Sequence, residues 1–160
     1  MLYQVKQKIW SWSDGFKILD QNGDLAYRIN GKPFSWGDNL SFQDVYGKEL
    51  ATIAQTLLSF NPNYAIYKNG SLFAEVTKEF SWVKAKFTLD VPGPNDYKIT
   101  GDFWDYEYEF IREGRTVAQV SKSFWPWSDT YGVSIVSGED DVSILCTVII
   151  IDLVCHDNNN

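Results

Sequence analysis

Most of the chain alternates between hydrophobic and polar residues in short runs separated by turn residues. In the stretch FKILDQNGDLAYRI, residues 16–29, an Asn-Gly step separates two such runs. Alternation with a period of two is typical of β-strands, and Asn-Gly between two strands is a strong hairpin signal. The pattern therefore predicts a β-hairpin that turns at Gly23.

The same pattern recurs further along the chain. Gly47, Gly70 and Gly114 also lie between short β-type runs, and superposing them on Gly23 aligns a β-branched residue six positions later. The aligned residues are Ile29, Ile53, Val76 and Val120. Other alternating runs fill the gaps, so we expect about a dozen antiparallel strands between residues 2 and 137, with one hairpin unit used four times.

One of the predicted strands, Phe103–Ile111, carries aromatic and acidic residues in alternation. The aromatic set is Trp104, Tyr106, Tyr108 and Phe110, and the acidic set is Asp105, Glu107 and Glu109. Because side chains in a strand point to opposite faces in turn, we expect every aromatic ring to point inward and every acid outward.

Residues 142–155 break the alternation, because they are almost wholly apolar and have no polar stripe. Their β-branched content would suit a central strand, but their length and lack of alternation favour a buried helix. Asp140 or Asp141 would cap its N-terminus. We expect this helix to span about residues 141–155.

A dozen antiparallel strands are expected to close into a barrel, whose lumen would be too wide for its own side chains to fill. We place the apolar helix in that lumen. Its predicted core residues are Val142, Ile144, Leu145, Val148, Ile149 and Ile151. The predicted fold is thus all-β with one helix: a single domain, residues 1–160, forming an antiparallel closed barrel around a central C-terminal hydrophobic helix.

Several motifs, in this order, resemble the LURP-one-related (YxjI-like) family of the tubby C-terminal-like superfamily. They are the turn Asp20–Gly23, the related pair Val76-Thr77-Lys78 and Val120-Ser121-Lys122, the stretch Trp127–Val133, and the apolar run that closes on Asp152. The resemblance implies a twelve-stranded barrel wrapped around a hydrophobic C-terminal helix. The superfamily includes phosphoinositide-binding tubby proteins and phospholipid scramblases, whereas its small single-domain members have no established activity to carry over.

Tubby proteins bind the phosphorylated head group with basic residues near an early hairpin, and the matching region here resembles residues 28–34. This region contains Arg28 and Lys32, which are therefore the candidate residues for a phospholipid head group. It lacks the dense basic cluster that a phosphoinositide attracts. The alternative is that Arg28 and Lys32 are two solvated loop charges.

The formal net charge of −7 argues against a generic nucleic-acid binder, which would carry a basic face. The apolar run of residues 142–155 is shorter than the roughly 20 residues that a transmembrane helix needs. Cys146 and Cys155 are nine residues apart, about 13 Å along a helix, which is too far for a disulfide. Buried thiols and the lack of a signal peptide predict a cytoplasmic protein without a transmembrane segment.

Candidate chemistry is sparse. His156, the only histidine, follows Cys155, but we expect a surface histidine at a helix C-terminus rather than a catalytic or metal-binding one. The acids 105, 107 and 109 could gather Ca²⁺, or form a solvated acidic face. The seven tryptophans could form a ligand platform or fill the barrel. No nucleotide-binding or catalytic motif is present, and we expect no cofactor.

Three functions remain open from the sequence. The first is a non-enzymatic binding module for phospholipid head groups or a protein partner. The second is a hydrolase or other enzyme that uses surface carboxylates on a lipid or small substrate. The third is a structural partner in an assembly.

Overall fold

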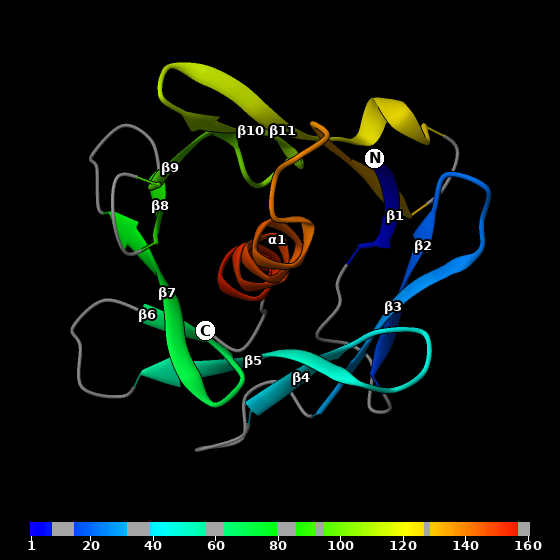
Figure 1. The fold of residues 1–160 in the computed structure, drawn as a ribbon. Helices are drawn as coiled ribbons and strands as arrows, with labels where there is room; N and C mark the ends of the chain where they lie inside the picture. The colour runs from blue at the N-terminus through cyan, green and yellow to red at the C-terminus, as the bar shows by residue number, and fades with distance from the viewer. Residues whose placement is uncertain are drawn as a thin grey trace.

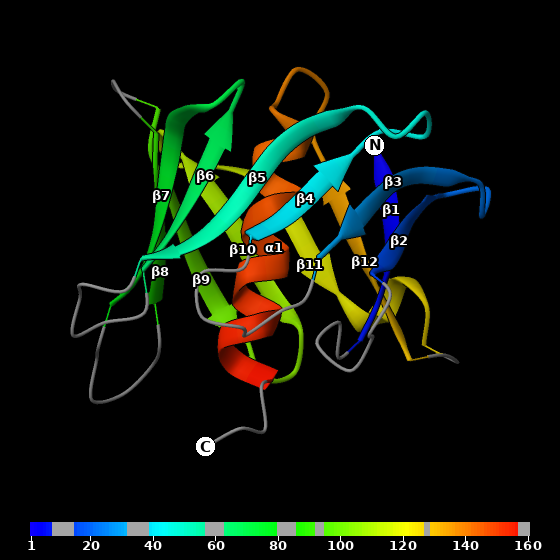
Figure 2. The ribbon, with the colours of Figure 1, turned by 90° about the horizontal axis from the view of Figure 1, so that it is seen from below.

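The computed structural model describes residues 1–7, 15–31, 39–56, 63–79, 86–91, 95–126 and 129–156. Within these residues, twelve strands form one closed antiparallel barrel in which every strand pairs with its neighbours in sequence and β1 pairs with β12. The helix α1 (Asp141–His156) runs through the middle of the barrel (Figures 1 and 2). The predicted fold class is therefore confirmed.

The strands are short and follow one another around the barrel. The first six are β1 (Leu2–Lys6), β2 (Phe16–Asp20), β3 (Leu25–Asn30), β4 (Asn39–Gln43), β5 (Glu49–Thr56) and β6 (Asn63–Lys68). The second six are β7 (Ser71–Glu79), β8 (Lys86–Asp90), β9 (Tyr97–Asp102), β10 (Glu107–Arg112), β11 (Arg115–Ser121) and β12 (Thr130–Ile135). A 3₁₀ turn, η2 (Lys122–Phe124), follows β11.

The repeated hairpin is present in β2–β3, β4–β5, β6–β7 and β10–β11. Each of the four turn glycines that the sequence aligned has a positive φ, 86° at Gly23 for example, a conformation that glycine adopts without strain. Each hairpin also has a register shift close to its turn. The residues six positions beyond the glycines are all buried, so the alignment identified equivalent inward positions.

The predicted strand over residues 103–111 was wrong in its first part. Residues 103–106 form a turn, and β10 starts at Glu107. Asp102 causes this turn, because its Oδ1 accepts hydrogen bonds from the backbone N–H groups of Trp104 and Asp105, each at 3.1 Å. As a result Trp104 is 62% exposed, contrary to the prediction, whereas Tyr106, Tyr108 and Phe110 are buried.

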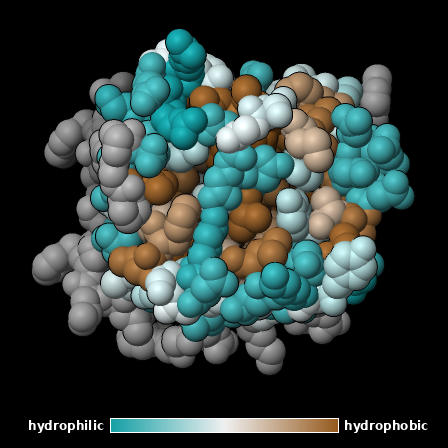
Figure 3. All heavy atoms as spheres, in the orientation of Figure 1, coloured by the Kyte–Doolittle hydropathy of each residue, from teal (hydrophilic) through white to brown (hydrophobic). Residues whose placement is uncertain are grey.

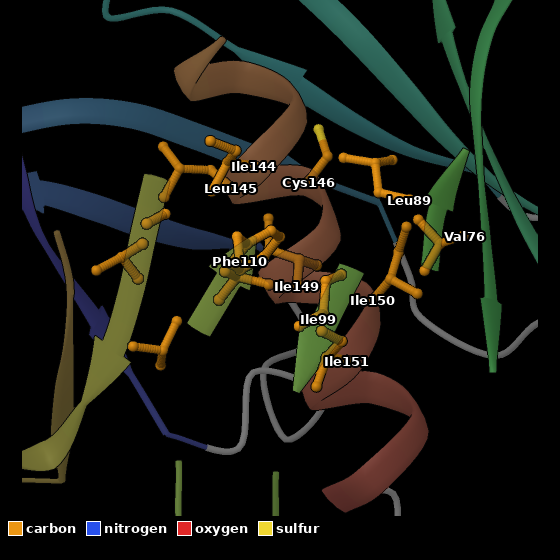
Figure 4. Packing of buried hydrophobic residues seen from close by; sticks show 14 of the residues in the cluster. Val76, Leu89, Ile99, Phe110, Ile144, Leu145, Cys146, Ile149, Ile150 and Ile151 are labelled. Atoms are coloured by element: carbon orange, nitrogen blue, oxygen red, sulfur yellow. The ribbon is translucent and has the colours of Figure 1, made fainter. Parts of the chain in front are cut away.

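The helix supplies the centre of the hydrophobic core. Figure 4 shows Ile99 and Phe110 of the barrel wall next to Ile149, and Leu89 and Val76 on the side of Cys146 and Ile150. Five of the six predicted core residues are at most 1% exposed, and Val142, in the first turn, is half-buried. The buried five are Ile144, Leu145, Val148, Ile149 and Ile151. Strands surround the helix on every side, which fits its lack of a polar face. Burial of each large apolar side chain contributes roughly 1.5–3 kcal/mol to the free energy of folding.

Candidate functional site

Cavities lie outside the filled centre of the barrel. One, of about 450 Å³, lies at the end where α1 begins and where the four hairpins turn; we call this end the mouth. Another, of about 410 Å³, lies on the outer face of β1 and β2; we call it the outer groove. Of the two predicted binding residues, Arg28 is exposed on β3, and Lys32 lies outside the described residues.

The register of the first three strands brings cations together near the outer groove. Arg28 on β3 lies directly opposite Lys17 on β2. Gln4 on β1 pairs with Leu19 on β2, and Lys6 and Lys17, two residues beyond this pair on each strand, both line the outer groove. All three cations point outward, because the residues next to them in each strand point into the core. We call Lys6, Lys17 and Arg28 the basic row.

The outer groove exists because β1 and β2 pair over only two residues of each strand, Tyr3 with Asp20 and Gln4 with Leu19. Beyond that point the described ladder stops. The lining combines polar and apolar groups, namely Gln4, Lys6, Gly15, Phe16, Lys17, Leu19 and Thr130. Two members of the basic row, Lys6 and Lys17, therefore line a hollow in the surface.

Without a bound anion, the positive charges of the basic row repel one another. Like charges directly opposite one another across two strands destabilise the pair. In the described part of the chain, neither Lys17 nor Arg28 forms an ion pair, and the neighbour of Arg28 on β4 is the neutral Gln43. An anion bound between these cations would relieve their repulsion.

At the mouth, three consecutive acids connect the start of α1 to several parts of the barrel wall. Glu139 accepts hydrogen bonds from Arg112 on β10, at 2.6 Å, and from the hydroxyl of Tyr97 on β9, at 2.9 Å. Asp140 forms an ion pair with Lys68 on β6. A fourth wall residue, Tyr3 of β1, donates its hydroxyl hydrogen bond to Asp141. The acids therefore fix the position of the helix terminus in the barrel.

Asp140 is the N-cap of α1. Its Oδ1 accepts from the backbone N–H of Ser143 at 3.3 Å, and its Oδ2 accepts from the Ser143 hydroxyl at 2.7 Å. Burial raises the pKa of Asp140, but the hydrogen bonds from Lys68 and Ser143 outweigh it and bring the pKa below its ordinary value. The carboxyl group is thus held as an anion.

The mouth cavity lies beside this charged cluster, between the start of α1 and strands β7 to β10. Leu72, Phe73 and Val91 give it an apolar wall. The remaining lining residues are Asn95, Tyr97, Arg112, Gly138, Asp140 and Ser143. Figure 3, which looks onto the mouth, shows hydrophobic residues in the hollows between hydrophilic ones.

His156 lies at the opposite end of the barrel and is only partly exposed. Its Nε2 donates to the backbone carbonyl of Phe103 at 3.0 Å, and its ring stacks on Tyr106 with 4.2 Å between centroids. Tyr106 in turn stacks on Tyr131. These contacts attach the helix C-terminus to the turn after β9 and give the histidine a structural role.

The other candidate reactive groups are held in structural contacts or buried. Glu107 accepts from the Ser121 hydroxyl and Glu109 from the Thr116 hydroxyl, so both acids bind β11. In the described ranges, no three His, Cys, Asp or Glu side chains are grouped so that they could hold a metal ion. Burial raises the pKa of the Cys155 thiol to about 11 and that of Cys146 further, which suppresses the reactive thiolate.

A family model described as LURP-one-related matches residues 1–152. The chain is also 33% identical over 156 residues to the uncharacterized protein YxjI of Bacillus subtilis (strain 168), covering 98% of this chain and 94% of that protein. The chain belongs to the LURP-one-related family. The resemblance carried by the sequence motifs is thereby confirmed.

More distant relatives of this family member occur in Arabidopsis thaliana. The protein LURP-one-related 15 is 24% identical over 168 residues, which cover 92% of this chain and 77% of that protein. The X-ray structure of a protein from Arabidopsis thaliana has the same fold, with a TM-score of 0.65, 16% identity, and coverage of 99% of this chain and 91% of that one. Among the residues that the structure describes, α1 included, no helix has the length and apolar character to cross a membrane.

Proposed function

We propose that this LURP-one-related protein is a non-enzymatic binding module that holds a phosphate-bearing group, such as a phospholipid head group, on the outer face of β1 to β3. The observation that carries the proposal is the basic row beside the outer groove. Lys17 faces Arg28 across two strands, and Lys17 and Lys6 line the same hollow. Converging cations of this kind are what a phosphorylated head group needs.

The sequence raised this expectation with Arg28 and Lys32, and the basic row supports it at Arg28, whereas Lys32 lies outside the described residues. The sequence of residues 28–34 lacks a dense basic cluster. Lys6 and Lys17, on the neighbouring strands, supply the additional cations near Arg28. The outer groove gives the ligand a concave surface, and Phe16 and Leu19 add apolar contact area beside the cations. A head group attached to a lipid would use both kinds of contact.

The enzyme hypothesis receives less support from the geometry. General acid–base catalysis by a carboxyl group at neutral pH favours a raised pKa. Asp140 instead has a lowered pKa, and Glu139 next to it is engaged by Arg112 and Tyr97. These carboxylates lie at the mouth, where they attach the helix to the wall rather than face a free reacting group.

The proposal is tested by sedimentation with phosphatidylcholine vesicles, with and without phosphatidylinositol bisphosphate, at low and physiological salt. The double variant Lys17→Gln/Arg28→Gln removes the facing pair. Each cation near an anionic membrane surface contributes about 1 kcal/mol to the free energy of binding. The double variant should therefore bind the vesicles roughly 30-fold more weakly. Its unfolding temperature should not fall, because the substitutions remove repulsion.

The matched control is Lys48→Gln/Lys98→Gln, which changes the net charge equally at two exposed positions outside the basic row. This control should keep nearly full binding. Soluble inositol phosphate and inorganic phosphate, added as competitors, separate a head-group site from a site for free phosphate. Equal loss of binding in both double variants, or no binding at low salt, would refute the proposal.

A further inference from the structure

Exposed hydrophobic side chains gather at the mouth. Among the described residues, six large hydrophobic side chains are exposed, and only Trp104 lies at the opposite end. The five at the mouth are Met1, Val45, Tyr46, Leu72 and Val136. Tyr46, at the tip of the β4–β5 turn, is 92% exposed. Singly scattered exposed apolar side chains are normal, but their concentration at one end of the barrel, around a cavity, favours an interaction surface there.

The mouth cavity would give a partner a place to insert an apolar side chain. Leu72 is 52% exposed at its edge, and Phe73 and Val91 continue the apolar wall inward. The volume of about 450 Å³ is within the range of ligand pockets, so it has room for a large side chain. Interfaces concentrate their binding energy where a large side chain of one partner fills such a pocket.

The charges around the cavity indicate what kind of partner fits. The two cations nearest the cavity, Lys68 and Arg112, are already paired with acids at the start of α1. Seven carboxylates in or directly beside the turns β2–β3, β4–β5, β8–β9 and β10–β11 form no ion pair in the described part of the chain: Asp20, Asp24, Asp44, Glu49, Asp90, Asp96 and Glu113. Only two side-chain cations there, Lys48 and Arg115, are similarly unpaired within the described ranges.

From this arrangement we infer that the mouth docks a basic protein segment, which inserts an apolar side chain between Leu72 and Val91 and places Lys or Arg residues over the surrounding carboxylates. The excess of acids attracts such a segment and repels an anionic bilayer or an acidic peptide. This surface is separate from the outer groove. A partner bound at the mouth would leave the basic row accessible.

A random-peptide phage library selected on the immobilised protein tests the inference and requires no named partner. We expect the enriched peptides to share a large apolar residue flanked by Lys or Arg. In fluorescence polarisation, the binding of such a peptide should weaken with increasing salt. The variant Leu72→Lys should lower the affinity at least about tenfold, and Glu113→Lys should lower it less.

The matched control is Trp104→Lys, which makes the same kind of change at the exposed hydrophobic residue of the opposite end. It should leave peptide affinity unchanged. All three substituted side chains are exposed, so circular dichroism should show a native spectrum for each variant. The inference is overturned if no peptide is enriched, if the enriched peptides are acidic, or if Leu72→Lys binds as well as the wild type.

Discussion

Asp140 holds the helix to the barrel through the hydrogen bonds that it accepts and through its negative charge. Two substitutions, to alanine and to asparagine, separate these contributions. In Asp140→Ala, α1 loses its N-cap, which costs about 1 kcal/mol. The hydroxyl of Ser143, which is 1% exposed, also loses its acceptor, which costs roughly 1–3 kcal/mol. The ion pair with Lys68 adds less than about 1 kcal/mol, because both side chains are partly exposed. We expect a total loss of roughly 3 kcal/mol.

Asp140→Asn is the matched variant, since asparagine caps helices as well as aspartate and still accepts a hydrogen bond from Ser143. Only the ion pair with Lys68 and the favourable interaction of the charge with the helix dipole are lost, together about 1 kcal/mol. Urea and thermal unfolding at neutral pH, both followed by circular dichroism, measure the two variants. For a chain of this length, Asp140→Ala should lower the unfolding temperature by roughly 6–12 °C.

The pH dependence of the free energy of unfolding gives a second test of the role of the Asp140 charge. The pKa of Asp140 is lowered in the folded state, so its charge stabilises the fold above the unfolded pKa of about 3.9, and this contribution is lost as the pH falls further. The difference in stability between the wild type and Asp140→Asn should therefore shrink in acid. If Asp140→Asn is as unstable as Asp140→Ala, or if the difference persists at low pH, the assigned roles are wrong.

Three further predictions concern the core, one turn and the thiols. Ile149→Ala, at a position with no exposure, should lower the free energy of unfolding by roughly 2–5 kcal/mol and Ile149→Val by about 1 kcal/mol, as read from urea midpoints; equal effects would contradict a tightly packed lumen. Gly101→Ala should reduce the unfolding temperature, because a Cβ there would lie 2.4 Å from the carbonyl oxygen of Glu107 and φ is +141°; an unchanged temperature would count against this geometry. Cys146 and Cys155 should react with a thiol reagent only as fast as the protein opens, so fast labelling of the native protein would disagree with their burial.

The barrel and its helix could be predicted because their signals are local in the sequence. Each repeated turn has a glycine at the position that needs a positive φ, and the run that begins at Val142 is too long and too uniformly apolar for a surface element. The turn before β10 was missed, because the alternation over residues 103–111 concealed the hydrogen bonds that Asp102 makes to the backbone after it.

The basic row could be predicted only in part. Lys17 follows Lys6 by eleven residues and Arg28 follows Lys17 by eleven, and no local pattern connects the three. They come together only through the register of β1, β2 and β3. The short β1–β2 ladder and the register shift between β2 and β3 cannot be read from residue types. The contacts of Glu139, Asp140 and Asp141 with different strands could not be predicted either, because their partners are far away in the sequence.

The position of α1 in the chain affects how the protein can be made. The ribosome completes every strand before it begins the helix, so the inward faces of the growing sheet lack their natural partner throughout most of synthesis. Nascent chains in this state expose apolar surface and unpaired strand edges, which chaperones recognise. The hairpins can form early because their contacts are local, but the core is complete only when the helix has emerged.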